Sequence, residues 1–292
     1  MRKLPAVLGA LGLAATTGLV AVQPAAATGS RGGGSSLYLL ESNGTLSVRD
    51  AKRPLLTEHR VKVRGLAAGD RLVGLDTRPA TKQLYAMGKS GQLYTVNAHT
   101  GHATKVGTPA AGAVGTAVGF DFNPTVDRIR LVTEAGRNLR LHPDTGAVAA
   151  VDGTLAYATG SHKPRVAASA YTDSFAGATT TGLYGLDAGK DTLVTQGSLP
   201  GRTPAVSPNT GQLFTVGHLG RDISAVNGFD IDGRARTAGS YDARDYTAIA
   251  AVRTTGLLAG SKLVKVDLRT GRTIPLLALG LGDVVGLTFA AR

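Results

Sequence analysis

The sequence has no cysteine and no tryptophan, and aromatic residues make up only 5% of its 292 residues. Without cysteine the chain can form no disulfide, no thiolate metal site and no lipid-modified export signal. Its stability must therefore come from packing and from the way the chain closes on itself. Because aromatic residues are scarce, a stacking surface for nucleic acid is not expected, and we predict no nucleic-acid partner.

Acidic residues are also few, with 20 Asp and Glu against 32 Lys and Arg, which gives a formal net charge of +12. The basic residues are scattered along the chain and form no run. A positive surface attracts anionic cell-wall polymers or acidic polysaccharide. The same charge can simply keep an exported protein in solution. An anionic polymer is therefore one candidate partner, and we expect the protein to be a monomer.

Long apolar runs are absent except over residues 4–22, which follow two basic residues and precede three alanines. This pattern is typical of a secretory signal peptide over residues 1–27, and an uncleaved membrane anchor is the alternative. Residues 28–36 are rich in glycine and serine, which predicts a flexible leader. We expect one domain over 37–292, no stable membrane insertion after cleavage, and a secreted or cell-wall-associated protein.

What the sequence does contain is a series of short apolar stretches separated by glycine-rich turns, with no sustained helical period, so we predict an all-β fold. Residues 73–107 hold four such stretches: VGLDT, QLYAM, QLYTVN and HATKVG. Four short antiparallel strands in about 35 residues correspond to one blade of a β-propeller. Thr-Gly pairs that end the short loops at 97–101, 143–146 and 267–271 fit hairpin turns.

The number of blades follows from the first strand of each unit. Aligning these strands gives five units, and the longer spacings are explained by insertions at 173–182 and 233–245. Chain length alone suggests six, but a sixth unit would need TPAVSP, residues 203–208, as an inner strand. Proline cannot donate to a strand ladder, so this segment is a poor strand. We expect five four-stranded blades, with six as the alternative.

The two ends of the chain each carry an incomplete blade. VVGLTF at 284–289 has no strands after it, whereas SLYLLES, GTLSVRD and HRVKVRG at the start have no inner strand before them. The ends should therefore pair to complete one blade. Such closure by the N- and C-terminal strands joins the ring and protects strand edges from aggregation.

Four stretches carry a resemblance to a known family: GLDTRPATKQLYAMGKSGQLYTVNAHTG, GFDFNPTVDRIRLVTEAGRNLRLHPDTGAVAAVDGTLAY, AYTDSFAGATTTGLYGLDAGKDTLVTQG and NGFDID. In these the chain resembles secreted bacterial proteins grouped as domain of unknown function 4394. The resemblance spans about residues 72–289. It implies a propeller-like fold and secretion, and it implies no reaction, because the family has no established activity.

The third position of each aligned first strand carries a side-chain oxygen: Asp76, Asp121, Thr172, Asp230 and Thr288. Innermost strands of a propeller surround its axis, so these side chains should recur around it. They could bind a polar ligand, and the three carboxylates, Asp76, Asp121 and Asp230, could hold a hard cation such as calcium. The structural alternative is that each accepts a hydrogen bond from a backbone N–H of the adjoining blade.

No catalytic residue is assigned from the sequence. The six histidines show no zinc-enzyme spacing, the stretch DIDG at 230–233 lacks the later ligands of a calcium loop, and no nucleophile elbow or P-loop occurs. We therefore predict a non-enzymatic binding module of unknown ligand. An extracellular hydrolase or lyase that uses an axial cation on a sugar, lactone or peptide is the alternative, and a purely structural envelope protein is the third.

Overall fold

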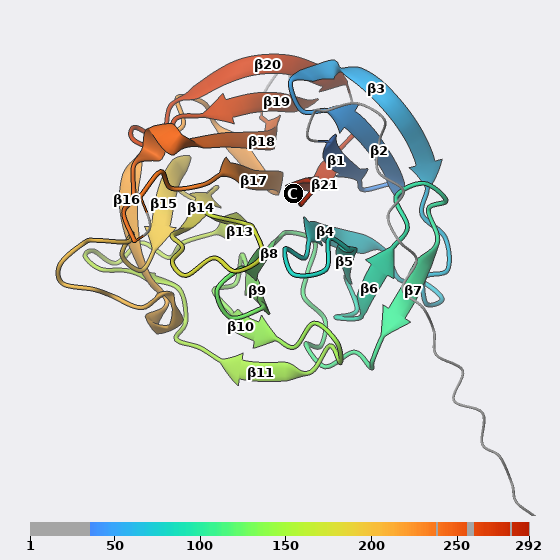
Figure 1. The fold of residues 1–292 in the computed structure, drawn as a ribbon, viewed down its shortest axis with the longest axis horizontal. Helices are drawn as coiled ribbons and strands as arrows, with labels where there is room; N and C mark the ends of the chain where they lie inside the picture. The colour runs from blue at the N-terminus through green and yellow to red at the C-terminus, as the bar shows by residue number, and fades with distance from the viewer. Residues whose placement is uncertain (1–35, 238, 256–259, 281, 292) are drawn as a thin grey trace, which may run out of the picture.

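Five β-sheets stand around a central axis like the blades of a propeller, with residues 284–289, the last strand of the chain, near the centre of the ring (Figure 1). The computed structural model describes residues 36–237, 239–255, 260–280 and 282–291. The predicted signal peptide and residues 28–35 of the leader lie outside the described residues. Within the described residues, no helix is long and apolar enough to cross a membrane.

Each blade is an antiparallel sheet with its innermost strand at the axis and its outermost strand at the rim. From the axis outward, blade 1 contains β21 (Val284–Phe289), β1 (Ser36–Glu41), β2 (Thr45–Asp50) and β3 (Arg53–Lys62). Blade 2 contains β4 (Leu72–Thr77), β5 (Leu84–Gly88), β6 (Leu93–Val96) and β7 (Ala103–Val106). Blade 3 contains β8 (Val118–Asn123), β9 (Arg128–Thr133), β10 (Asn138–Leu141) and β11 (Val148–Val151).

Blade 4 contains β13 (Val166–Tyr171), β14 (Leu183–Asp187), β15 (Thr192–Gln196) and β16 (Gln212–His218), with β12 (Ala156–Tyr157) added in parallel at the rim. Blade 5 contains β17 (Ile223–Gly233), β18 (Tyr246–Thr254), β19 (Gly260–Val266) and β20 (Thr273–Gly280). Two short 3-10 helices, η1 (Pro208–Thr210) and η2 (Ala243–Asp245), lie in connections. The all-β prediction with five four-stranded blades is confirmed.

The six-blade alternative is wrong because residues 203–208 form no strand. They are an irregular connection between β15 and β16, and η1 begins at Pro208. The two prolines that made this segment a poor strand in the sequence are accommodated in the connection, since neither has to donate to a ladder.

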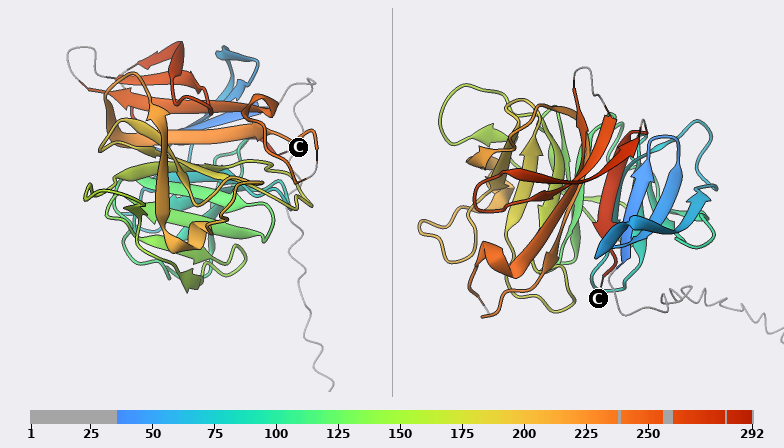
Figure 2. Two further views of the ribbon diagram at one scale, coloured as in Figure 1. Left: turned by 90° about the vertical axis from the view of Figure 1, so that its left-hand side faces the viewer. Right: turned by 90° about the horizontal axis from the view of Figure 1, so that it is seen from above.

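The two ends of the chain close the ring, as predicted. β21 pairs antiparallel with β1, in a register that opposes Leu37 to Phe289 and Leu39 to Leu287. All six residues of β21 are buried. β21 is the innermost strand of blade 1 and lies beside β1, where the red end of the ribbon meets the blue strands (Figure 2). The last strand of the chain is therefore also part of the core.

Glycines allow the innermost strands to approach one another closely near the axis. A Cβ on Gly119 of β8 would lie 2.1 Å from Ser169 Oγ of β13, and one on Gly286 of β21 would lie 2.6 Å from Leu75 Cβ of β4. Real Cβ atoms do not approach other heavy atoms so closely. These positions therefore exclude larger residues for packing reasons and not because of φ.

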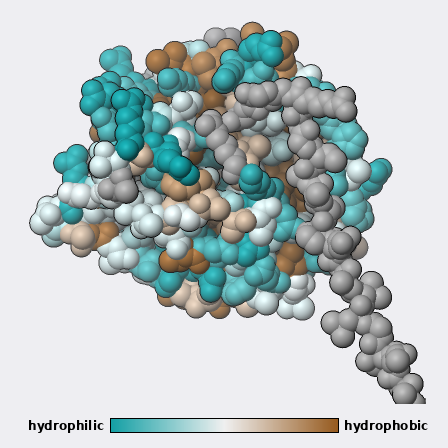
Figure 3. Space-filling model, in the orientation of Figure 1, coloured by the Kyte–Doolittle hydropathy of each residue, from teal (hydrophilic) through white to brown (hydrophobic). Residues whose placement is uncertain are grey.

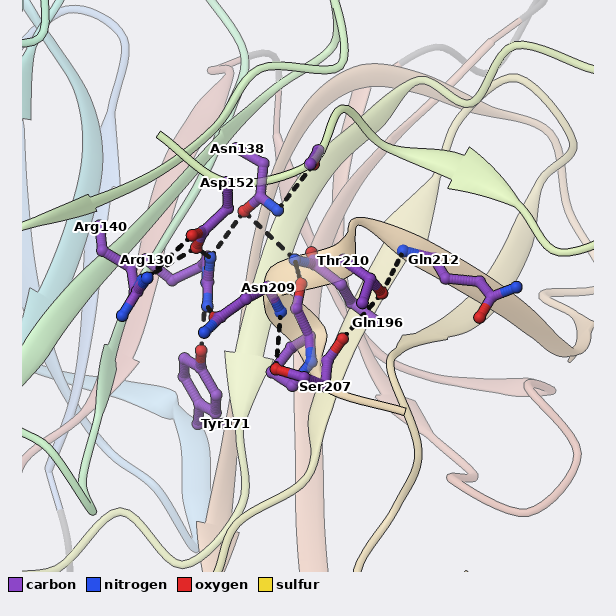
Figure 4. A network of polar contacts seen from close by, with 12 residues as sticks. Arg130, Asn138, Arg140, Asp152, Tyr171, Gln196, Ser207, Asn209, Thr210 and Gln212 are labelled. Atoms are coloured by element: carbon purple, nitrogen blue, oxygen red, sulfur yellow. Dashed lines mark hydrogen bonds and ion pairs between the residues drawn. The ribbon is translucent and has the colours of Figure 1, made fainter. Parts of the chain in front are cut away.

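A buried polar network joins blades 3 and 4 (Figure 4). Arg130 of β9 is 1% exposed, and its guanidinium donates to Asp152 Oδ2 at 2.5 Å, to Asn138 Oδ1 at 2.7 Å and to Asn209 Oδ1 at 2.7 Å. Its Nε donates to the hydroxyl of Tyr171 at 3.2 Å. Because Asn209 belongs to η1, this network ties the irregular connection of blade 4 to the sheet of blade 3.

Apolar side chains are exposed at the rim between blades 5 and 1. They lie on the outermost strands β3 and β20, and they are Leu55, Leu56, Ile274 and Leu276. The space-filling view shows hydrophobic groups gathered along the edge that these strands occupy (Figure 3). The exposed apolar surface of these two strands thus lies at the periphery, away from the axis.

Candidate functional site at the propeller axis

Four of the five predicted ring residues join neighbouring blades at the axis. Asp76 Oδ2 accepts a hydrogen bond from Phe122 N of the next blade at 2.7 Å, and Asp121 Oδ1 accepts one from Tyr171 N at 3.0 Å. Asp230 Oδ2 accepts from Phe289 N at 2.7 Å, and Thr288 Oγ1 accepts from Thr77 N at 3.3 Å. The structural role expected as the alternative for these residues is therefore confirmed at these four positions.

Thr172 does not share this pattern of accepting a backbone N–H of the adjoining blade. Its hydroxyl donates to Asp173 Oδ2 at 3.1 Å and accepts from Gly182 N at 2.9 Å, both within blade 4. The link to blade 5 is made by the next residue, because Asp173 Oδ1 accepts from Ala235 N at 2.7 Å and its Oδ2 accepts from the Tyr246 hydroxyl at 2.7 Å. β13 ends at Tyr171, and the chain turns at Asp173, which has φ of 56°. Because of this turn, the contact with blade 5 is made by Asp173 and not by Thr172.

The three predicted carboxylates converge. One oxygen each from Asp76, Asp121 and Asp230 lies within 4.8 Å of the others, and these side chains are at most 5% exposed. Among the residues that the structure describes, no Lys, Arg or His forms an ion pair with any of them, and Asp121 Oδ2 has no hydrogen-bond donor. Like charges buried this closely must be compensated by protons or by a cation.

The position of Thr288 adds a second reason for compensation. Its hydroxyl oxygen lies 2.8 Å from Asp76 Oδ1 and 3.0 Å from Asp230 Oδ2. A hydroxyl carries one hydrogen, so it can donate to only one of these carboxylates. The other short contact needs a proton on the carboxyl group. The same oxygens could instead share a positive ion, which removes the repulsion between them.

Burial raises the pKa of all three carboxyl groups. For Asp76 the charge of Asp230 adds to burial and places the pKa well above its usual range. For Asp121, burial acts together with the charges of Asp76 and Asp230 to raise the pKa in the same direction. For Asp230, burial raises the pKa to about 6, although its hydrogen bonds oppose the shift. Without a cation, the group therefore retains protons at pH values where ordinary aspartates are ionised.

These shifts predict that the cation-free protein loses stability as the pH rises. Above about pH 4 the unfolded chain has released these protons while the folded protein still binds them, so the free energy of unfolding falls through pH 6 and beyond. Asp230 alone should account for about 1 kcal/mol between pH 5 and 7.5. The measurement is denaturant unfolding with a chelator present. Asp230→Asn should flatten the profile.

The matched control is Asp50→Asn at the end of β2 in blade 1. A hydrogen bond from Arg53 lowers the pKa of Asp50, so this group is ionised in the folded and the unfolded states across the same pH range. Its replacement should leave the slope unchanged. A slope of the opposite sign in the wild type would show that the axial carboxyls do not hold protons.

A cavity of about 380 Å³ opens over the axial carboxylates. Asp76, Asp230 and Thr288 line it, whereas Asp121 and Thr172 do not. Both insertions noted in the sequence reach this cavity, through Phe175 of one and Arg234 of the other. The Arg234 guanidinium carbon lies 3.6 Å from the centre of the Phe175 ring, so the two loops meet and form one wall together.

The sequence that forms these blades matches the model of one protein family. The model of the family described as Domain of unknown function (DUF4394) matches residues 45–288. The chain belongs to this family. A search of the curated proteins gave no match.

Two solved structures are similar to this DUF4394 protein. One is the nidogen/laminin complex, at 14% sequence identity, with a TM-score of 0.51 over 88% of this chain and 98% of the other. The other is the dihydro-heme d1 dehydrogenase NirN in complex with DHE, at 10% identity and a TM-score of 0.41, over 90% of this chain and 48% of NirN. The first likeness supports the propeller fold. The chain spans about half the length of NirN.

Proposed function

We propose that the protein is an exported, secreted or cell-wall-associated binding module that holds a divalent cation at its axis and presents it to a ligand in the central cavity. The observation that carries this proposal is the convergence of Asp76, Asp121 and Asp230 with no basic side chain paired to them among the described residues. Calcium is the first candidate, because it prefers several oxygen ligands and tolerates irregular geometry.

The side of the cation site that faces the central cavity would be open for coordination by a ligand. Three carboxylates supply fewer oxygens than the six to eight that calcium usually takes. Oxygen atoms of a ligand in the cavity of about 380 Å³ could complete the coordination. The apolar run and alanines at residues 4–27 support export, and the positive net charge supports an anionic partner outside the cell.

The cavity wall favours binding over the hydrolase or lyase alternative. The described residues that line it include no His, Lys or Cys, and Ser174 offers a hydroxyl without a base beside it. General acid–base catalysis would then depend on Asp232 or on the same carboxyls that hold the cation. Carboxylates that are held in place by hydrogen bonds from backbone N–H groups suit cation binding better than proton transfer.

Calcium should stabilise the folded protein in a way that depends on the axial carboxylates. At about 100 times the dissociation constant, binding adds about 2.7 kcal/mol, which corresponds to roughly 5–10 °C in Tm for a domain of this size. Asp121→Asn keeps the shape of the side chain and should remove most of this shift. The measurement is a thermal unfolding series against calcium, magnesium, manganese and zinc.

The control variant is Asp187→Asn, which alters a fully buried aspartate of blade 4 that is far along the chain from the three axial residues. It can lower the absolute Tm but should retain the shift with calcium. If none of the four cations changes the Tm of the wild-type protein, the axial cation is disproved, and the carboxylates serve only to join the blades.

A further inference from the structure

A second and larger cavity, of about 700 Å³, lies between blades 4 and 5. Blade 4 contributes side chains from β14 to β16 and from residues 197–206, the connection between β15 and β16. Blade 5 contributes residues 241–244 of its insertion and 268–269 of the turn after β19. None of these residues lines the central cavity. The volume falls in the range of sites for small organic ligands.

One wall of this cavity is aromatic and held in place. The hydroxyl groups of Tyr184 and Tyr241 are hydrogen-bonded to each other. Tyr241 also stacks on Tyr246, with ring centres 5.5 Å apart and an angle of 16° between the rings. Phe214 of β16 lines the same cavity and is half-buried. Tyr184 is fully buried, so the partly exposed rings that line the cavity are those of Tyr241 and Phe214, and the contacts to Tyr184 and Tyr246 hold the ring of Tyr241 in place.

The cavity also carries three exposed arginines, Arg202, Arg244 and Arg269. Arg244 pairs with Asp242 at 2.6 Å, and Arg269 approaches Asp267 at 3.4 Å. Among the described residues, Arg202 has no carboxylate partner. Its charge acts on both Tyr184 and Tyr241 and opposes the burial that raises the pKa of these phenols, which places it toward the aromatic wall.

The charge of this cavity is opposite to that of the central one. The central cavity contains Asp76, Asp230 and Asp232 with a single arginine, whereas the larger cavity contains three arginines with Asp242 as its single carboxylate. A guanidinium presents a planar fork of donors that matches a carboxylate with two parallel hydrogen bonds. The larger cavity is therefore suited to an anion with planar acidic groups.

We propose that the cavity between blades 4 and 5 binds a segment of a sugar chain that carries carboxylates, such as a uronic-acid polymer. The arginines bind the carboxylates, and the aromatic wall packs against the apolar faces of the sugar rings. The hydroxyls of Thr203 and Tyr241 line the same space and suit the hydroxyl rim of a sugar. The volume exceeds what an inorganic anion needs, and the site does not depend on the axial cation.

Calorimetric titration of the full chain with oligogalacturonate tests this proposal. Its methyl ester is the matched probe, because it keeps the sugar chain and removes the negative charge. We expect binding of the acid form at low salt and a loss of at least about tenfold in affinity for the ester. Arg202→Gln and Arg269→Gln should each weaken binding of the acid form by about tenfold, as expected for a lost charged hydrogen bond.

The control variants are Arg64→Gln and Arg71→Gln. Both arginines are exposed and lie in the connection between β3 and β4, on another part of the ring. These changes lower the net charge equally and should leave the affinity unchanged. Equal losses in all four variants would mean that only the overall charge attracts the polymer, and the site would be disproved.

Two further measurements separate this site from others. Affinity should be the same with chelator and in Asp121→Asn, and a loss there would place the sugar chain over the axial cation instead. Polyglutamate of similar charge should bind at least about tenfold more weakly. Equal or tighter binding of polyglutamate, or equal binding of the methyl ester, would overturn the assignment to an acidic sugar chain.

Discussion

Deletion of residues 284–292 is expected to abolish folding of the whole ring. β21 is the innermost strand of blade 1, and its residues Val284, Leu287 and Phe289 pack in one core cluster with residues of β1 and of blade 5. Burial of these three side chains contributes roughly 5–9 kcal/mol as an upper bound, which is comparable to the total stability of a domain. Circular dichroism and gel filtration should show an aggregated product without the native β-sheet spectrum.

Two companion chains make this result specific. Deletion of residues 291–292 alone leaves β21 and the hydrogen bond from Ala290 N to Ser36 O, and it should fold normally. A chain in which 282–290 precede Ser36 through an Asn-Gly turn should also fold, because Leu37 opposes Phe289 across the antiparallel pair. A soluble, folded product from the deletion of 284–292 would show that the ring does not depend on this closure.

Replacement of Arg130 by methionine is expected to cost about 3–5 kcal/mol of folding stability. The change leaves Asp152, 5% exposed at its side chain, without its closest charged partner and removes the donors to Asn138 and Asn209. Removal of one member of a buried ion pair is strongly destabilising. Here the buried carboxylate of Asp152 would keep only the partly exposed Arg140 as a charged partner. Denaturant unfolding measures the loss.

Arg140→Met provides the matched comparison, because Arg140 donates to the same carboxylate from a position 32% exposed. We expect a cost of about 1 kcal/mol there, since solvent screens this pair. The double variant Arg130→Met with Asp152→Leu should recover much of the stability lost by the first change. Equal costs for Arg130→Met and Arg140→Met would contradict the assignment of the network in Figure 4 as the tie between blades 3 and 4.

The blades could be predicted from the sequence because their pattern is local and repeated. Each inner strand carries the same short motif, and hairpin turns mark the strand ends. The five units, their inner strands and the closure by 284–289 can therefore be recognised from the sequence alone. The proline pair at 204 and 208 favoured five blades over six, and the structure decided between them. The same repeat also predicts that Asp76, Asp121 and Asp230 lie together around the axis.

The rest depended on geometry that has no sequence pattern. Asp173 replaces Thr172 because the chain turns at a residue with positive φ, and an alignment by repeat cannot detect a shift of one residue. The cavity between blades 4 and 5 combines side chains from several segments, among them Arg202, Tyr241 and Arg269. The available signals were the length of the insertion at 233–245 and the absence of a strand at 203–208, and neither identifies a partner residue.

The most direct test of the axial site is a crystal structure of the protein soaked with calcium, or with manganese as an anomalous scatterer. We predict one anomalous peak between the carboxylates of Asp76, Asp121 and Asp230, with calcium at about 2.3–2.6 Å from their oxygens. Unchanged carboxylates with no peak between them at saturating cation would contradict a cation site at the axis.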